Sequence, residues 1–483
     1  MAAGPTTSQE DALVNTGDTA WILTSAALVL LMTPGLALFY GGMVRAKSVL
    51  NMMMMSFGAL ALISVLWVLY GYSMSFGNDV GAGLLGNPTE FLGLEGLMED
   101  TTSETGGLPV MAFVGFQAVF AIITTALISG AIAERAKFGA WMVFVGIWVT
   151  LVYFPIAHWV FDFTLTDGDG VVTHVGGWIA NNLGAIDFAG GTAVHINAGA
   201  AGLALALVLG KRTGFGGEAM RPHNLPLVMI GAGLLWFGWF GFNAGSAVAA
   251  NNTAAVAWVN TFVATGAACL GWLLVEKVRD GHSTSLGGAS GVVAGLVAIT
   301  PACSAVSPLG AIPLGLVSGV LCALAVGLKY RFNYDDSLDV VGVHLVGGLV
   351  GTIGLGFLAT SAAPAGVDGL FYGGGADQLW RQVVGALAVL VASFVATYII
   401  GLLIQKTMGF RINEDDELTG IDSVVHAETG YDFSALGGGG GSHTQEHALP
   451  SRPTRTARAA ESSAPAEPSL FAASLPHRST EGA

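Results

Sequence analysis

The sequence predicts an all-α polytopic membrane protein with eleven transmembrane helices. Of its 483 residues, 53% are hydrophobic and only 11% are charged, whereas a soluble chain carries about 25% charged residues. A run of about 20 apolar residues is long enough to cross roughly 30 Å of hydrocarbon as a helix. Eleven runs meet this length, near residues 20–41, 49–75, 110–133, 138–161, 190–210, 225–245, 254–276, 286–304, 309–329, 339–359 and 380–406.

The positions of Lys and Arg predict an extracellular N-terminus and a cytoplasmic C-terminus, because basic residues concentrate in cytoplasmic loops. Of the fourteen basic residues before residue 412, thirteen fall on one side of the membrane and only Arg381 falls on the other. The first apolar run is full length and has no basic stretch ahead of it, so we expect a true span and not a cleaved signal.

Runs one to five and six to ten form two sets of five, followed by one extra helix. An odd number of spans per set means that the second set is inserted upside down, which is the inverted-repeat plan of many transporters. We therefore expect an extracellular N-terminus (1–19), a transmembrane domain (20–410) and a cytoplasmic segment (411–433). Residues 434–483 are rich in Gly, Ser, Pro and Ala, a composition that predicts a disordered tail.

Charge and cysteine usage exclude several classes of function. A net charge of −15 does not suggest a nucleic-acid partner. The three cysteines fall in apolar runs without metal-like spacing, so we expect packing roles, with no metal and no cofactor. The chain is expected to transport a substrate and not to act as an enzyme.

Two histidines carry the same pattern in corresponding places of the two sets. Val194-His195-x-x-Ala198-Gly199-x-x-Gly202 is matched by Val343-His344-x-x-Gly347-Gly348-x-x-Gly351. On a helix, positions +3, +4 and +7 share the face of the histidine, so each histidine ends a stripe of very small residues. Such a stripe lets helices approach closely or leaves a narrow path open. An ionisable residue in a membrane span indicates function; the alternative is a core histidine bonded to a neighbouring carbonyl.

The repeat symmetry predicts one pore at the repeat interface, with His195 and His344 facing each other near mid-membrane. Two imidazoles in a dry pore stay neutral, because desolvation disfavours their charged form. They can then offer a lone pair or an N–H to a small polar molecule and relay a proton to one another.

Aromatic and acidic residues indicate a cation site at the outer mouth. The loop 76–109 carries six acidic residues and no basic one, and a negative mouth concentrates a cationic substrate; solvated loop charges are the alternative. Phe116, Gln117 and Phe120 lie in the third run, and Trp239, Phe242 and Ser246 lie in or just after the sixth. Aromatic stripes usually serve packing, but beside an acidic mouth they also offer a cation–π site, and Ser246 can accept a hydrogen bond.

Asp187 stands just ahead of the fifth run. Its expected role is to cap that helix and to complement the positive helix end. Holding negative potential beneath the cation site is a second role, compatible with the first.

The chain resembles the ammonium transporters, in the prokaryotic Amt branch of the Amt/Mep/Rh superfamily, over roughly residues 17–433. The resemblance is carried by Gly17-Asp-Thr-Ala-Trp21, Leu31-Met-Thr-Pro-Gly-Leu36, Phe39-Tyr-Gly-Gly-Met-Val44, Asp187-Phe-Ala-Gly-Gly-Thr-Ala-Val-His195, Gly238-Trp-Phe-Gly-Phe-Asn-Ala-Gly-Ser246, Thr300-Pro-Ala-Cys303 and Val341-Gly-Val-His344. It implies ammonium uptake across the cell membrane, with His195 and His344 as the pore pair.

The resemblance also implies roles for the outer residues. Phe120 and Phe242 would form a gate, and Phe120 and Ser246 with an aromatic residue of the fourth run would recruit ammonium, near the family's essential aspartate at Asp187. Gln117, Phe161 and Trp239 complete the candidate substrate-binding residues. The family forms homotrimers with one pore per subunit, and its cytoplasmic tail docks a PII signal protein (GlnK-like).

The chain departs from the family pattern at the end of the fourth run. The family usually has Trp followed by Gly-Gly, but here Phe161 takes that place and an acidic insertion, 162–173, precedes Gly176. The third wall of the recruitment site could therefore come from Phe161, Trp159 or Trp178.

Physical chemistry favours ammonia as the species that passes through the pore. Carrying NH4⁺ through an apolar pore exposes it to a desolvation cost on the order of tens of kcal/mol in the Born limit, which neutral ammonia largely avoids. A proton-coupled carrier for another small cation would need carboxylates inside the spans, and the only acidic residues within the run bounds, Glu276 and Asp339, stand at the ends of their runs. A pure ammonium sensor would need an attached signalling domain, and the tail is too short and too polar for one.

Overall fold

The computed structural model describes residues 14–98, 107–217 and 219–431. The predicted tail at 434–483, most of the N-terminal segment and Glu99, Asp100 and Glu104 of the acidic loop lie outside the described residues. In chain order the described α-helices are α1 (Thr16–Met43), α2 (Val49–Leu66), α3 (Tyr72–Phe76), α4 (Val110–Ile128), α5 (Phe138–Trp148), α6 (Phe154–Phe161), α7 (Asn197–Leu209), α8 (Leu225–Gly245), α9 (Asn252–Asp280), α10 (Ser285–Ile299), α11 (Pro308–Ala325), α12 (Leu328–Phe332), α13 (Val346–Leu358), α14 (Asp377–Thr407) and α15 (Glu414–Thr419).

Shorter helical turns join or extend these helices. The π-helical turns of the described chain are η3 (Trp67–Gly71), η7 (Val149–Tyr153), η8 (Ile179–Leu183), η9 (Gly191–Ile196), η10 (Val341–Leu345) and η12 (Asp422–His426). The 3₁₀ turns are η2 (Ala46–Ser48), η4 (Leu92–Leu94), η6 (Ser129–Ile132) and η11 (Leu370–Tyr372). One antiparallel hairpin, β1 (Leu165–Thr166) and β2 (Val172–His174), pairs Leu165 with His174 and lies in the acidic insertion.

The predicted all-α polytopic fold is confirmed. Within the described residues, ten helical segments are long and apolar enough to cross a membrane, and they match ten of the eleven predicted runs. The eighth run was predicted at 286–304, but its helix α10 ends at Ile299 and is too short to count among the ten. Thr300 keeps helical dihedrals (φ −51°, ψ −49°), but the nitrogen of Pro301 carries no hydrogen and cannot donate the next helical hydrogen bond, so the helix stops there.

Polar caps fix where several helices begin. Thr284 accepts a hydrogen bond from the amide of Gly287 at the start of α10, and Ser307 accepts one from Gly310 at the start of α11. Asn224 does the same for the amide of Leu227 in α8. Side-chain oxygens at these positions satisfy amides that have no partner inside the helix.

Glycines let the helices pack closely. A Cβ added at Gly231 of α8 would meet the backbone of Phe39 on α1, and one at Gly315 of α11 would meet the backbone of Ala264 on α9. Beside the histidines, a Cβ at Gly199 would meet the backbone of Leu345. The small-residue stripes therefore bring the two histidine-bearing segments into close contact.

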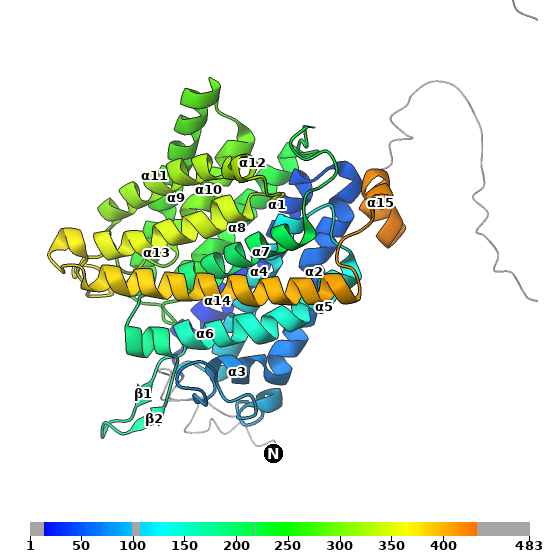
Figure 1. The fold of residues 1–483 in the computed structure, drawn as a ribbon. Coiled ribbons are helices and arrows are strands. Elements are labelled where there is room, and N and C mark those ends of the chain that lie inside the picture. Colours follow the sequence, from blue (N-terminus) through cyan, green and yellow to red (C-terminus); the bar gives the residue numbers. More distant parts are fainter. Residues whose placement is uncertain (1–13, 99–106, 218, 432–483) are drawn as a thin grey trace, which may run out of the picture. The chain divides into compact units, whose positions relative to one another are not determined.

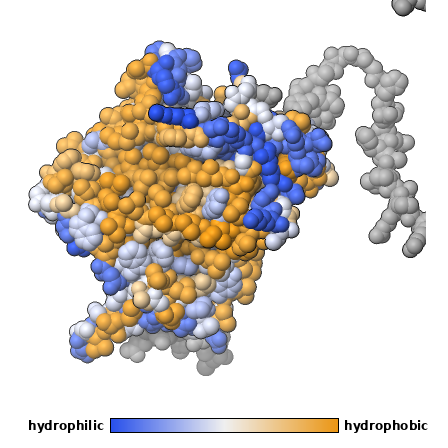
Figure 2. Space-filling view, in the orientation of Figure 1, coloured by the Kyte–Doolittle hydropathy of each residue, from blue (hydrophilic) through white to orange (hydrophobic). Residues whose placement is uncertain are grey.

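The long helix α14 runs across the face of the molecule shown in Figure 1 and packs on α7 and α5. On its inner side Ser393 donates a hydrogen bond to the carbonyl of Asn197, and Thr397 accepts one from the indole of Trp148. Figure 2 shows a broad apolar face over these helices, to which α14 contributes a helical stripe of exposed side chains. The stripe comprises Trp380, Val384, Leu387, Val391, Val395, Tyr398 and Leu403. A continuous apolar face of this kind suits contact with lipid.

Candidate functional site: a histidine pair in an apolar cavity

The two histidines are presented by matching segments. His195 lies in the π-turn η9, which leads into the 13-residue helix α7, and His344 lies in η10, which leads into the 13-residue helix α13. A π-turn widens the helix by one residue and often occurs at functional sites. Both side chains are buried.

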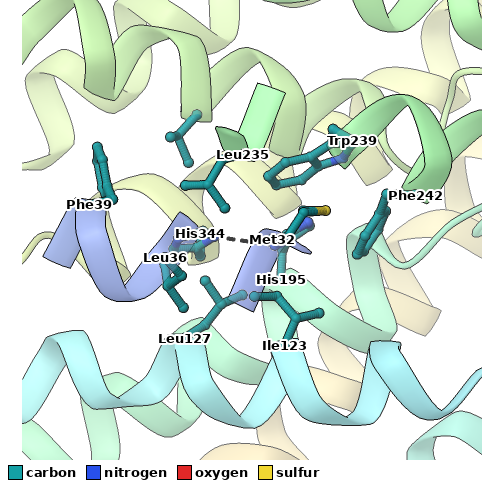
Figure 3. Close-up of a pocket in the computed structure, with 11 residues that line it drawn as sticks. Met32, Leu36, Phe39, Ile123, Leu127, His195, Leu235, Trp239, Phe242 and His344 are labelled. Carbon is teal, nitrogen blue, oxygen red and sulfur yellow. Dashed lines mark hydrogen bonds between the residues drawn. The ribbon is translucent and has the colours of Figure 1, made fainter. Parts of the chain in front are cut away.

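The two imidazoles lie next to one another in the cavity that Figure 3 shows. Nδ1 of His344 is 3.2 Å from Nδ1 of His195, and the rings are stacked with centroids 5.3 Å apart. In a hydrogen bond between two neutral rings one Nδ1 donates and the other accepts. The donating ring then has a lone pair at its own Nε2, and the accepting ring carries a hydrogen at its Nε2. The pair therefore always offers one acceptor and one donor at its outer nitrogens.

The cavity around the pair is apolar and narrow. Nε2 of His195 has no hydrogen-bond partner among the described residues. The side chains leave a space of about 10 Å³ for the centre of a water-sized molecule, which is about what one water requires. A single ammonia-sized molecule fits there, and a hydrated cation does not. The lining residues are Met32, Leu36, Phe39, Ile123, Leu127, His195, Leu235, Trp239, Phe242, Val293 and His344.

Aromatic rings close the outer end of this cavity. The ring of Trp239 stacks on His195 with centroids 5.2 Å apart, and its indole nitrogen donates to the hydroxyl of Thr300 at 2.8 Å. Phe242 lies against Phe120 with centroids 4.3 Å apart. Because both phenylalanines are buried, a substrate that passes from the outer mouth to His195 requires these two rings to move.

Of the three aromatic candidates for the third wall, Phe161 is the one whose ring contacts Phe120, one of the two predicted gate residues. Its ring meets Phe120 edge-on with centroids 6.5 Å apart. Trp159 instead packs on Trp178 and donates its indole hydrogen to the carbonyl of Leu84, in the outer loop. The insertion therefore leaves Phe161 beside Phe120.

The remaining predicted residues of the outer site lie on the same helices. Ser246 follows α8, and its hydroxyl donates to the carbonyl of Phe242 at 2.8 Å, so its lone pairs remain able to accept a hydrogen bond. Gln117 is half-buried on α4, between Phe116 and Phe120.

Asp187 caps the turn that presents His195. Its carboxylate accepts hydrogen bonds from the amides of Gly190 at 3.0 Å and of Thr192 and Ala193 at 2.9 Å. Burial raises the pKa of the Asp187 carboxyl, while these amides lower it, and the net direction is upward. The capping role expected from the sequence thus has a geometric basis in three backbone contacts.

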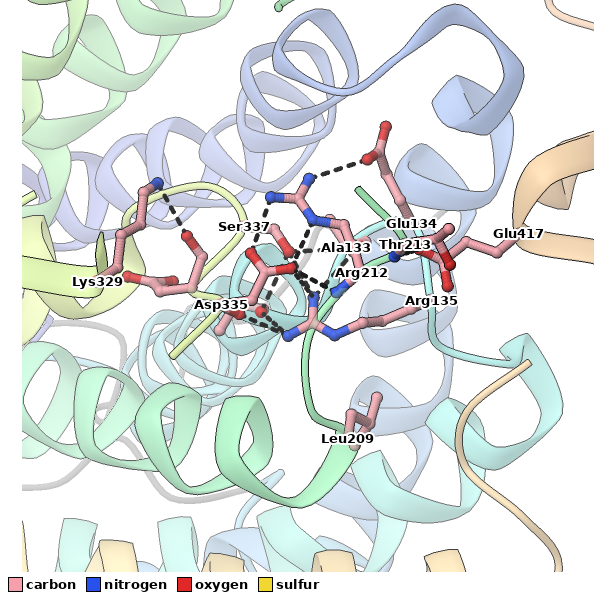
Figure 4. A network of polar contacts seen from close by, with 12 residues as sticks. Ala133, Glu134, Arg135, Leu209, Arg212, Thr213, Lys329, Asp335, Ser337 and Glu417 are labelled. Atoms are coloured by element: carbon pink, nitrogen blue, oxygen red, sulfur yellow. Dashed lines mark hydrogen bonds and ion pairs between the residues drawn. The ribbon is translucent and has the colours of Figure 1, made fainter. Parts of the chain in front are cut away.

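The cytoplasmic side of the fold carries a buried ionic network (Figure 4). Arg212 bonds Asp335 with Nε and Nη2, both at 2.9 Å, and Glu134 with Nη1 at 2.9 Å. Arg135 reaches the backbone carbonyl of Asp335 at 2.6 Å. Burial would raise the pKa of the Glu134 carboxyl, but the charge of Arg212 and the bonds from Arg45 hold it below its usual value.

The segment after α14 is attached to this network. Glu417 of α15 accepts hydrogen bonds from the amide of Thr213 and from the guanidinium of Arg411. Lys47 donates to the backbone carbonyls of Glu417 and Leu418. Residues 411–431 therefore form a docked segment on the face that the sequence predicts to be cytoplasmic.

Sequence reasoning missed three features of the site. Neither π-turn was predicted, because these segments are apolar on every face, so a shift of one residue in the helical phase leaves no mark on the hydrophobic pattern. Thr300 was noted only as part of a motif, and its bond to Trp239 joins residues 61 positions apart. Asp336, which caps η10, gave no signal except its distance from His344.

The fold defines a polytopic membrane protein, and the site is a narrow apolar cavity beside two histidines. A family model described as "Ammonium Transporter Family" matches residues 20–431. An ammonium transporter of Mycobacterium tuberculosis is 60% identical over 442 residues, which cover 87% of this chain and 91% of the relative. An ammonium transporter of Bacillus subtilis is 46% identical over 86% of this chain and 99% of its own length. The crystal structure of Saccharomyces cerevisiae Mep2 superposes with a TM-score of 0.76 at 33% identity, covering 84% of this chain and 90% of that one. The chain belongs to the ammonium transporter family; it is a multi-pass protein of the cell membrane and not an enzyme.

Proposed function

We propose that the protein takes up ammonium by binding NH4⁺ at the outer aromatic site, removing one proton, and passing ammonia along the histidine pair while the proton is relayed. The observation that carries this proposal is the contact of 3.2 Å between the two Nδ1 atoms inside an apolar cavity. Because the pair offers one donor and one acceptor, it can hydrogen-bond a neutral ammonia.

The outer site supports recruitment of the cation form. Phe120 and Phe161 present aromatic rings, which attract a small cation electrostatically. Asp187 lies buried at the start of η9 with its carboxylate bonded only to backbone amides among the described contacts. Its negative charge lowers the energy of a cation held above the pore.

Discrimination against other cations follows from the size and dryness of the cavity. A potassium ion cannot give up a proton, so it would have to cross the apolar stretch with its full charge and without its water. Ammonium avoids this cost because its proton and its neutral part can move separately.

The experiment that tests the proposal is a current measurement on purified protein in liposomes. An ammonium gradient, with ammonium as the only permeant, should produce an inward current, and an equal potassium gradient should produce none. Ammonia flux without any current would contradict the proton relay, and an equal potassium current would contradict the separation of proton and ammonia.

We also propose a homotrimer with one pore per subunit, packed through Gly/Ala-rich helix faces, and a PII signal protein as the partner of residues 411–433. Close approach of small residues is what drives helix association in lipid. One neighbour of known structure, titled "Sensor Amt Protein", superposes with a TM-score of 0.76 at 27% identity over 86% of this chain and 99% of its own length. A detergent mass of one protomer at every concentration would contradict the trimer.

A further inference from the structure

The two pore histidines share one more feature, which lies eight residues before each of them. Asp187 precedes His195 by eight positions, and Asp336 precedes His344 by eight. Both carboxylates lie at the start of the π-turn that contains the histidine, Asp187 at η9 and Asp336 at η10. The second carboxylate is on the side that the sequence predicts to be cytoplasmic.

The two carboxylates make the same kind of contact. Asp187 accepts from Gly190 with Oδ1 and from Thr192 and Ala193 with Oδ2. Asp336 accepts from the amide of Val340 with Oδ1 at 3.0 Å and from the amide of Val341 with Oδ2 at 2.7 Å.

An ionised carboxylate is best suited to these contacts, because both of its oxygens only accept hydrogen bonds. In an amide one of the two terminal groups is purely a donor, and in a protonated carboxyl one oxygen carries a hydrogen and is the weaker acceptor. A donor that faces a backbone N–H loses that hydrogen bond and leaves a buried amide unsatisfied.

The cap on η10 acts on His344 through a short and tightly packed turn. Val341 is the first residue of η10 and His344 is the fourth. Gly342, between them, would meet the backbone of Val326 if it carried a Cβ. The turn is therefore packed closely on Val326 between its capped end and His344.

We propose that Asp336 is a positioning residue, which holds His344 at hydrogen-bonding distance from His195 by fixing the start of η10, and that protonation of Asp336 loosens this hold. The inference rests on the proposed function of the histidine pair. It adds to that function a dependence on cytoplasmic pH.

The charges around Asp336 set the pH range. Burial and then the charge of Asp339 raise the pKa of the Asp336 carboxyl to about 6, against the lowering influence of Lys329 and of the two amides. The other titratable groups that act on this carboxyl are Tyr334, at the end of the α12 turn, and Tyr40, on α1. The Asp336 carboxyl therefore takes up its proton at a higher pH than an ordinary aspartate, as the cytoplasmic side becomes mildly acidic.

The upward direction of the pKa shift of Asp336 allows a loosening of η10 to be distinguished from unfolding of the protein. A carboxyl whose pKa is raised in the folded protein binds its proton more tightly there than in the unfolded chain. Protonation of Asp336 therefore favours the folded state as the pH falls from 7 toward 5. A loss of transport in that range cannot be a loss of fold caused by this group.

The test uses the full-length protein in liposomes, with the pH at the cytoplasmic face varied from about 7.5 to about 5.5 and the outer pH fixed. Wild-type ammonium transport should fall with a midpoint near pH 6. The variant Asp339→Asn should move that midpoint to lower pH, because it removes the charge that raises the pKa of Asp336. Asn tolerates the positive φ of 65° at this position.

The variant Asp336→Asn should transport on the order of 10- to 100-fold more slowly, since a small displacement of a reacting group costs about this much, and its rate should no longer respond to pH near 6. Asp336→Glu should recover part of the rate. The matched control is Asp368→Asn, which removes a carboxylate that accepts from the amide of Ser361 in an outer loop. Its rate and its pH profile should equal those of the wild type.

A second readout does not depend on transport. Hydrogen–deuterium exchange of peptides that cover 340–346 should be faster in Asp336→Asn than in the wild type and unchanged in Asp368→Asn. If His195→Leu shows that the relay is wrong, this exchange still decides whether Asp336 holds η10.

Two results would overturn the inference. One is wild-type exchange over 340–346 in a folded Asp336→Asn protein. The other is an unshifted midpoint in Asp339→Asn, which decides the matter even if Asp336→Asn does not fold.

Discussion

The outer mouth and the cytoplasmic face of the transmembrane domain are held together by different kinds of contact. At the outer mouth, Phe120, Phe161 and Phe242 meet through ring contacts. At the cytoplasmic face, Arg212 joins Glu134 and Asp335 in bonds of 2.9 Å that are almost fully buried.

The difference matches two tasks. Ring contacts and cation–π attraction are worth about 0.5–2 kcal/mol each, so an aromatic mouth can open and can release a cation quickly. Breaking a buried ion pair costs about 3–5 kcal/mol, so the network keeps the cytoplasmic loops and the docked segment in place. The aromatic contacts are suited to a site that binds and releases its ligand quickly. The buried ion pairs are suited to holding the loops in one conformation.

The largest effect is expected from breaking the buried network. Arg212→Ala removes the main partner of Asp335 and one of the two arginines that pair with Glu134, and we expect a loss of about 3–5 kcal/mol of stability. The thermal midpoint in detergent measures this change. The control is Arg279→Ala, which removes a pair with Asp280 whose side chains are 48% and 41% exposed and should cost about 0–1 kcal/mol. Equal midpoints for the two variants would mean that the inner network is no stronger than a surface pair.

The next effect concerns the docked segment. Deleting residues 411–433 should abolish co-purification with a PII protein, because it removes the whole docked segment, including Glu417 and Leu418, whose carbonyls Lys47 holds. Deleting 442–483 should leave binding unchanged. If both truncated proteins still bind PII, the partner docks elsewhere on the cytoplasmic face.

The smallest effect is expected at the mouth. Phe161→Ala should weaken the apparent affinity for ammonium by about 2- to 30-fold, the equivalent of one cation–π contact, with assembly unchanged. Trp178→Ala is the control, since its ring packs on Trp159 and not on the gate. If Trp178→Ala weakens the apparent affinity for ammonium and Phe161→Ala leaves it unchanged, the insertion has rebuilt the site.

The sequence predicted the spans well because hydrocarbon thickness imposes a length on every apolar run. Ten of the eleven runs became helices long enough to span, and their limits differ from the prediction by a few residues. The exception, α10, ends early at Pro301, a local signal that run length alone ignores. The contact of His195 with His344 agrees with the placement expected from their matching motifs.

The remaining features depend on pairs that are distant in the sequence. The ion pair between Arg212 and Asp335 joins residues 123 positions apart, and neither hydrophobic period nor loop charge reveals it. Lys and Arg in the loops gave the orientation by their number, but their individual partners are decided by packing. The sequence could not decide which aromatic residue forms the third wall for the same reason. Phe161, Trp159 and Trp178 lie in one segment, and only the folded loop determines which of them lies beside Phe120.

The central claim is that both histidines are needed to move ammonium through the apolar cavity. His195→Leu and His344→Leu leave no hydrogen-bonding partner for ammonia or a proton in that space, where an unpaired polar group is costly. The decisive measurement is ammonium or methylammonium flux into liposomes from each variant, in preparations already shown to be folded trimers. The account predicts the loss of ammonium-driven transport in both. Wild-type flux in either variant would contradict it and would leave the histidines as core residues.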